Sequence, residues 1–194
     1  MQIFFSAIIG YLLGSISFSY LIGRYKAGID IRQHGSGNAG ATNTLRVLGK
    51  KAAAIVFLAD ALKGVAAVFT SYLLTGSDTG MAVGGLAAII GHNWPVFFNF
   101  RGGKGVATTI GVIVSVAFLP ALFAGIVAIM LLLVTRIVSL ASLVFLTFLP
   151  VTVLLSDLPA VYFWMSIVMA ILSYWRHRTN IVRLLQGKEN QIGR

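Results

Sequence analysis

The sequence predicts an all-α integral membrane protein with seven transmembrane helices, an N-terminus outside the cell and a cytoplasmic C-terminus. Three observations support this prediction. The 194 residues are 58% hydrophobic and 10% charged, with a mean hydropathy of +0.91, whereas about 25% of the residues of a soluble domain are charged. Several apolar runs reach about 18 residues, the length typical of a membrane span. Lys and Arg are concentrated between alternate runs.

The stretch 106–135 is the ambiguous part of this count. As one helix it would be about 45 Å long at 1.5 Å per residue, whereas the hydrocarbon core is about 30 Å thick. Pro120 in its middle also disfavours an unbroken helix. We therefore expect two short spans that turn near Pro120. The other five apolar runs each predict one span: 3–22, 53–75, 80–98, 138–155 and 160–175.

The distribution of charge sets the orientation. With seven spans, every Lys and Arg except Lys63 falls on one side, in the segments 23–52, 99–105 and 176–194 or at Arg136. The opposite side holds Asp78 and Asp157 and no Lys or Arg. Because cytoplasmic loops carry the excess of Lys and Arg, the basic side is expected to face the cytoplasm of a cell inner membrane.

The net charge of +10 is therefore interpreted as a consequence of topology and of attraction to anionic membrane lipids. No nucleic-acid partner is expected, because no soluble recognition module is visible. The whole chain, 1–194, is predicted to form a single membrane-embedded domain and to be a monomer. It contains no cysteine, which excludes a disulfide framework and a thiol nucleophile.

A first polar segment, HGSGNAGATNTLR, runs from His34 to Arg46. It contains a formal G-x-G-x-x-G, but the segment before it reads as a membrane span instead of a strand, so a dinucleotide site is rejected. Glycines nevertheless allow main-chain N–H groups to converge into a nest that binds anions. The candidate phosphate ligands are Ser36, Gly37, Asn38, Gly40, Thr42, Asn43 and Arg46. The alternative is a flexible interfacial turn with helix-capping residues.

A second glycine-rich segment, RGGKG, leads into the apolar stretch that begins at residue 106. A glycine-rich turn at a helix N-terminus presents unpaired N–H groups and the positive end of the helix dipole, which together favour an anion. It is not a Walker A loop, because Lys104 is followed by glycine. The candidates are Gly102, Gly103, Lys104 and Gly105. The alternative for the cations is simple anchoring on the cytoplasmic side.

Further polar residues lie near or within the spans. His177 and Asn180 are three residues apart and share one face of a predicted C-terminal helix that ends near Gly187. Ser142 can hydrogen-bond a neighbouring helix or a ligand. Asp60 and Lys63 are expected to pair, because a lone charge inside a span is costly. His92 is interpreted as a hydrogen-bonded structural histidine.

Several missing motifs narrow the chemistry. There is no H-x-x-x-x-D acyltransferase dyad, because Ala39, Phe97 and Val182 stand five residues after the three histidines. Carboxylates on the basic side are too few for a two-metal site, so we expect no metal and no cofactor. The residues fit best a reaction that needs no strong protein base, because its acyl donor is already activated by phosphate. Positioning and electrostatic stabilisation would then supply most of the catalysis.

Three blocks of the sequence carry a resemblance that spans nearly the whole chain. GSGNAGATNTLRVLG, GHNWPVFFNFRGGKGVATT and RHRTNIVRLLQGKE, in this order between apolar spans, strongly resemble the bacterial acyl-phosphate-dependent glycerol-3-phosphate acyltransferases of the PlsY family. The resemblance implies transfer of a fatty acyl group from acyl phosphate to the 1-hydroxyl of glycerol 3-phosphate, giving lysophosphatidic acid. Thr179 departs from the family pattern, which usually has an acidic residue there.

By the same resemblance, Ser36 and Arg46 are essential, the second block is the glycerol-3-phosphate site, and Glu189 has a more structural role. The expected catalytic residues are Ser36, Arg46, Lys104, His177 and Asn180. Ser142 joins the glycine-rich segments as an expected substrate contact. A membrane transporter of phosphorylated small molecules is the alternative, since helix N-termini aimed at anions also occur there. No inverted repeat is visible to support it.

Overall fold

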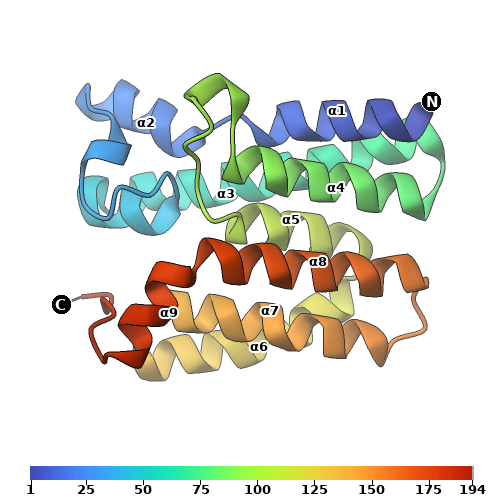
Figure 1. Ribbon diagram of the computed structural model, residues 1–194. Coiled ribbons are helices and arrows are strands. Elements are labelled where there is room, and N and C mark those ends of the chain that lie inside the picture. Colours follow the sequence, from blue (N-terminus) through green and yellow to red (C-terminus); the bar gives the residue numbers. More distant parts are fainter. Residues whose placement is uncertain (194) are drawn as a thin grey trace. The chain divides into compact units, whose positions relative to one another are not determined.

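The structure is a computed structural model that describes residues 1–193. These residues form helices joined by turns and loops, and no β-strand occurs among them (Figure 1). The all-α prediction is therefore confirmed. The chain divides into two compact units, which we describe separately: unit 1 is Met1–Ser115, and unit 2 begins at Val116. The prediction of a single domain stays a prediction.

Unit 1 is built from five α-helices and two short 3-10 helices. The 3-10 helices lie in the two polar connections, one before α3 and the other after α4. The elements are α1 (Gln2–Gly14), α2 (Phe18–Ala27), η1 (Ile31–Gln33), α3 (Ala41–Thr75), α4 (Asp78–Asn93), η2 (Val96–Phe98) and α5 (Val106–Val116).

Small residues allow the helices of unit 1 to pack with their backbones in contact. A Cβ at Gly10 or Gly14 of α1 would collide with the carbonyl groups of Gly84 or Ala88 of α4. The two contacts advance together along both helices, so α1 and α4 run parallel (Figure 1). Such small-residue contacts are typical of helix pairs in membranes, where close backbone approach replaces the hydrophobic drive available in water.

Further contacts place both polar loops at the same end of unit 1. Gly84 of α4 packs on Ser71 of α3, and Gly111 of α5 packs on Ala61 of α3. Gly80 of α4 likewise packs on Thr75, and Thr108 of α5 on Gly64, so α3 runs antiparallel to α4 and α5. The start of α3, the end of α4 and the start of α5 consequently lie at one end of the unit. The loops 28–40 and 94–105 meet these helix ends (Figure 1).

Two helix breaks differ from the predicted spans. The run 3–22 is interrupted between Gly14 and Phe18, because Ser17 has an extended backbone (φ −93°, ψ 91°). The second span was expected to start near residue 53, but α3 starts at Ala41 and contains a non-helical Gly49 (φ 82°, ψ 179°). Neither break can be seen in the hydropathy of the sequence, because both depend on backbone geometry and tertiary contacts.

Unit 2 contains α6 (Phe118–Thr135), α7 (Val138–Leu154), α8 (Ala160–Arg176) and α9 (Arg178–Leu185). Helices α6 and α7 are joined by a hydrogen bond from Thr152 Oγ1 to the Pro120 carbonyl oxygen, 3.0 Å long. Thr147 and Tyr174 link α7 to α8 through their hydroxyl groups, 2.7 Å apart. The predicted C-terminal helix is confirmed, and a glycine with positive φ, Gly187, follows it.

The chain breaks within the stretch 106–135, as predicted, but at Ala117 instead of Pro120. Pro120 lies in the first turn of α6, where its missing N–H costs no intrahelical hydrogen bond. The two pieces are also unequal, with 11 residues in α5 and 18 in α6. Proline here marks the beginning of the second helix.

Within the described residues 1–193, four segments are long and apolar enough to cross a membrane: Gln2–Ala27, Ala41–Thr75, Asp78–Phe98 and Phe118–Thr135. Three further apolar helices, Val106–Val116, Val138–Leu154 and Ala160–Arg176, are shorter. Each of the seven predicted spans thus has a counterpart among these segments. The number of helices that cross the membrane, and their direction, stay predictions.

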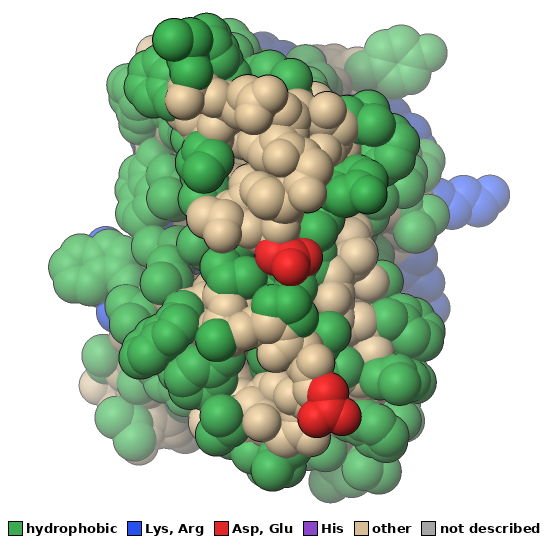
Figure 2. All heavy atoms as spheres, turned by 90° about the vertical axis from the view of Figure 1, so that its right-hand side faces the viewer, with side chains coloured by type: hydrophobic (Ala, Val, Ile, Leu, Met, Phe, Trp, Pro, Cys, Tyr) green, Lys and Arg blue, Asp and Glu red, His purple; other side chains and the backbone are tan. Residues whose placement is uncertain are grey.

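The charge of unit 1 is concentrated at the end that carries the two loops. Apart from Lys63, its Lys and Arg residues lie in the loops or on the adjoining parts of α2 and α3. The opposite end carries the turn between α3 and α4, where Asp78 lies. Figure 2 is turned so that the side of the turn faces the viewer; it shows acidic side chains on the facing surface, whereas Lys and Arg are seen only behind, at the margins.

Candidate functional site

The first polar loop is wrapped around the side chain of Asn43, which is 1% exposed. Its amide nitrogen donates to the carbonyl oxygens of Ile31 (3.1 Å) and His34 (3.0 Å), and its amide oxygen accepts from the Ser36 N–H (2.8 Å). Gly35 has φ +61°, and a Cβ there would collide with the Asn43 amide oxygen. Asn43 therefore shapes the loop, while its predicted direct contact with a substrate stays a prediction.

The same loop leads into the N-terminus of α3. Gly40 is its extended N-cap, and the first helical turn follows directly. Gly37 has a positive φ of 71°, and Asn38 and Thr42 are half-buried. Ser36 and Arg46 are exposed, so their hydroxyl and guanidinium groups are accessible from outside unit 1. Hydrogen-bond donors of the first loop thus lie near the N-terminus of α3, and donors at a helix N-terminus favour the binding of an anion.

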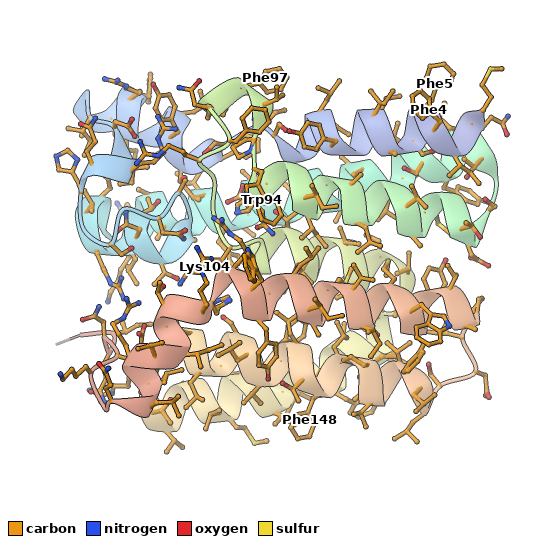
Figure 3. All side chains as sticks on the ribbon, in the orientation of Figure 1. Phe4, Phe5, Trp94, Phe97, Lys104 and Phe148 are labelled. Carbon is orange, nitrogen blue, oxygen red and sulfur yellow. The ribbon has the colours of Figure 1, made fainter. Side chains whose placement is uncertain are left out.

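The second loop folds back onto the end of α4. Gly103 donates its N–H to the carbonyl oxygen of His92, 3.1 Å away, and a Cβ at Gly102 would collide with the same carbonyl group. Gly105 has φ +82° and immediately precedes α5. Figure 3 shows Trp94 and Lys104 at the two ends of this connection and Phe97 at its tip. Lys104 therefore lies beside a second helix N-terminus.

The two glycine-rich loops touch each other. A Cβ at Gly103 would lie only 2.5 Å from the carbonyl oxygen of Ala39 in the first loop. Arg32 donates from Nη1 to the carbonyl oxygen of Phe98, 2.8 Å away, and its guanidinium lies 4.8 Å from the centre of the Tyr20 ring. The two loops therefore meet at one end of unit 1, whereas their predicted position on the cytoplasmic side stays a prediction.

An ion pair holds the guanidinium of Arg32 in place. Asp30 lies 2.8 Å from Arg32 Nη2 and also accepts from its Nε and its main-chain N–H. Hydrogen bonding from the Arg32 side chain lowers the pKa of Asp30 from 3.8 to about 2, against a smaller opposing effect of burial. The Asp30 carboxylate is therefore charged at neutral pH and orients the fork of Arg32.

A buried polar triad lies between α3, α4 and the break after α1. Lys63 Nζ is 2.7 Å from Asp60 Oδ1, 2.9 Å from His92 Nδ1 and 2.7 Å from the Ile16 carbonyl oxygen. The exposed fractions of these side chains are 2% for Asp60, 3% for Lys63 and 6% for His92. The predicted pairing of Asp60 with Lys63 is confirmed, as is the structural hydrogen bonding of His92.

In unit 2, His177 lies at the junction of α8 and α9 and is 2% exposed. Its Nδ1 lies 2.9 Å from the Ser173 carbonyl oxygen, which can only accept a hydrogen bond, so Nδ1 carries a proton. In the neutral ring, Nε2 then has the lone pair. Ser142 donates its hydroxyl to the Val138 carbonyl of its own helix, at 2.8 Å.

Asn180 is held by the segment that follows α9. Its amide nitrogen donates to Glu189 Oε1 at 2.7 Å, and Arg183 Nε donates to the other carboxylate oxygen at 2.7 Å. Burial acts to raise the pKa of Glu189, but hydrogen bonds from Arg183, Asn180 and Ser139 and the charge of Arg183 together outweigh it and lower this pKa. This arrangement agrees with the more structural role expected for Glu189. Sequence spacing gave no sign that Asn180 would contact it.

Comparison with known proteins identifies the family. The family model described as "Glycerol-3-phosphate acyltransferase" matches residues 4–187. The chain belongs to the glycerol-3-phosphate acyltransferase family. It is thus an integral membrane protein of a family of acyltransferases in phospholipid synthesis, and the resemblance seen in the sequence is confirmed.

The matches with individual relatives extend over nearly the whole length of both proteins. The glycerol-3-phosphate acyltransferase of Halalkalibacterium halodurans is 55% identical, covering 100% of this chain and 98% of the relative. That of Shouchella clausii is 53% identical, with 97% and 95% covered. The crystal structure of PlsY, an integral membrane glycerol 3-phosphate acyltransferase, is 42% identical. Its glycerol 3-phosphate form matches with a TM-score of 0.93, covering 100% of this chain and 96% of that one, and its lysophosphatidic acid form with 0.92.

Proposed function

We propose that this protein transfers a fatty acyl group from acyl phosphate to the 1-hydroxyl of glycerol 3-phosphate, releasing phosphate and lysophosphatidic acid. The contact between the two glycine-rich, cationic loops of unit 1 carries the proposal. One loop leads into the N-terminus of α3 and the other into the N-terminus of α5, and the two loops touch. Two adjoining sites that favour anions suit a reaction in which both substrates carry a phosphate. Membership of the family supports the same acceptor.

In the proposed mechanism, Arg46 and Lys104 neutralise phosphate charge together with N–H groups of both loops. The 1-hydroxyl oxygen attacks the acyl carbonyl carbon, the bond from that carbon to the phosphate oxygen breaks, and the departing phosphate takes the hydroxyl proton. No cofactor, metal or strong protein base is needed, because acyl phosphate is already activated. Holding both reactants in line and stabilising the developing charge supply the catalysis.

The proposal gives each remaining predicted residue a role. Ser36 orients an acceptor from the first loop, where its hydroxyl is exposed. Within unit 2, His177 presents the Nε2 edge of its ring, and Asn180 is oriented by Glu189. Gly37, Asn38, Gly40 and Thr42 are assigned to the first nest, and Gly102, Gly103 and Gly105 to the second. The N–H groups of Gly37, Gly40 and Gly103 already donate to carbonyl oxygens of the protein, so these three glycines shape the nests. Asn43 holds the first loop in shape. Ser142 is assigned a substrate contact by the same proposal.

The direct test uses the purified protein in detergent. Phosphate release is measured with palmitoyl phosphate and glycerol 3-phosphate together and with each alone, and the lipid product is identified by mass spectrometry. Release that requires both substrates and yields lysophosphatidic acid is the expected result. Palmitoyl-CoA replaces the acyl phosphate in a parallel reaction. No release with acyl phosphate, or equal product from the thioester, would contradict the proposed donor, and uptake of glycerol 3-phosphate into vesicles without acylation would favour transport.

We further propose a monomer with seven transmembrane helices in the cell inner membrane, an outer N-terminus and a cytoplasmic active site and C-terminus. The positive charge around the loops of unit 1 supports this direction. Because the sequence contains no cysteine, single cysteines report topology without background. Lys26→Cys should be labelled by a membrane-impermeant maleimide only after the inner membrane is opened, whereas Thr79→Cys should be labelled in intact spheroplasts. The reverse pattern would overturn the orientation.

A further inference from the structure

The buried triad of Asp60, Lys63 and His92 has no part in the chemistry just described. Two of its members carry full charges inside an apolar helix, α3. Ionisable groups within membrane spans are costly and usually serve a function. A buried ion pair is also weak evidence of stabilisation, since well-packed apolar residues often serve the fold equally well. The contacts of the triad therefore indicate what it does.

The ammonium group of Lys63 has three N–H donors and no acceptor. Its three neighbours, the Asp60 carboxylate, the Ile16 carbonyl oxygen and His92 Nδ1, can each accept one of them. His92 Nδ1 also lies 3.5 Å from Asp60 Oδ1. The triad thus fixes the orientation of the His92 ring.

The opposite edge of that ring lies against the second glycine loop. A Cβ at Gly103 would collide with His92 Nε2 and lie 3.0 Å from Cε1. The same residue donates its N–H to the His92 carbonyl oxygen, 3.1 Å away, and lies against Ala39 of the first loop. The side chain and the main chain of His92 therefore both determine where Gly103 lies. No flexible group separates the triad from the loop.

We propose that the Asp60–Lys63–His92 triad positions the second glycine loop and thereby sets the affinity for the phosphorylated acceptor, with Lys63 and Asp60 acting through His92. The inference rests on the proposed function for its substrate, glycerol 3-phosphate. None of the three is a catalytic residue in this scheme. They hold Gly102 and Gly103 so that the loop N–H groups and Lys104 are already placed when the acceptor arrives. Such pre-organisation strengthens binding because less ordering is needed on association.

The decisive variant removes both charges together, as Asp60→Asn with Lys63→Met. Lys63→Met alone would leave a buried carboxylate without its cation and can prevent folding. We expect the double variant to raise the KM for glycerol 3-phosphate about tenfold, equivalent to about 1.4 kcal/mol. The turnover number should stay within about threefold, and the KM for acyl phosphate should not change. Lys51→Met is the matched control, because Lys51 is exposed on the same helix.

Hydrogen–deuterium exchange gives a second measurement that needs no activity. Exchange in 99–105 should be faster in the double variant than in Lys51→Met, while the core of α4 stays protected. A parallel rise in both KM values, with lower turnover and a lower melting temperature, would show a merely structural role and overturn the inference, as would unchanged kinetics and exchange. If the unaltered protein releases no phosphate from its two substrates, the proposed function fails. In that case the exchange rates alone support or reject loop positioning.

Discussion

Arg32 Nη1 donates to the carbonyl oxygen of Phe98 across 2.8 Å, so one side chain ties the first polar loop to the second. The two residues are 66 positions apart in the chain. Asp30 fixes the guanidinium from one side, and the ring of Tyr20 lies 4.8 Å from it. Beside the contact of Gly103 with Ala39, the two loops are thus joined by a planar cation that forms several directed contacts, which a lysine could not reproduce.

Arg32→Lys should consequently lower turnover about tenfold and reduce stability by about 1.5 kcal/mol, a magnitude typical of lost hydrogen bonds to charged groups. The measurements are steady-state kinetics and thermal unfolding in detergent. Lys26→Gln, an exposed change on the neighbouring helix, should leave both unaltered. Wild-type kinetics in Arg32→Lys would show that the tie between the loops is dispensable.

The ion pair of Asp30 should make part of the protein's stability against unfolding sensitive to acid. Its pKa is lowered from 3.8 to about 2 in the folded protein, so the folded state favours the ionised carboxylate. The stabilisation is therefore complete above about pH 5 and is lost as the pH falls through the folded pKa. Melting temperatures of the unaltered protein and Asp30→Asn should differ by a constant amount above that range and converge toward pH 2. A difference that widens in acid would contradict this assignment.

Gly103→Ala tests the contact between the loops. The added methyl group would meet the Ala39 carbonyl oxygen at 2.5 Å and the ring of His92, so one loop must move. We expect the ratio kcat/KM to fall by about a hundredfold, in line with the cost of misplacing reacting groups by an ångström. Gly125→Ala is the control, because a Cβ there meets no atom within 4 Å. Equal activity of the two variants would mean that the reaction does not depend on the contact between the loops.

The two ring nitrogens of His177 have different roles in the proposed function, a structural contact for Nδ1 and a place in the site for Nε2. The carboxamide of Asn can reproduce the Nδ1 donor to the Ser173 carbonyl oxygen, but it has no group where Nε2 lies. We therefore expect His177→Asn to keep the melting temperature within a few degrees and to lower turnover at least a hundredfold, the scale of positioned acid–base or hydrogen-bonding groups. If turnover persists while the melting temperature falls, His177 serves only the junction of α8 and α9.

The two loops of the candidate site could be predicted from local sequence. Glycines beside short polar residues and a cation predicted both loops, because main-chain freedom and nearby donors are local properties. The role of Asn43 could not be predicted, since an amide in the first turn of a helix looks the same whether it binds a ligand or its own loop. Its three partners become visible only when the loop closes. The link from Asn180 to Glu189 was missed for the same reason.

The sequence by itself determined the membrane class, the helical fold and the gathering of cations, because these follow from hydropathy and charge along the chain. Tertiary structure alone decided where the helices break and which groups meet. The interruption after Gly14 leaves the Ile16 carbonyl oxygen for Lys63, and Gly103 touches Ala39 and His92. Such contacts join residues far apart in sequence and depend on backbones packing within ångströms, which no pattern of residue types specifies.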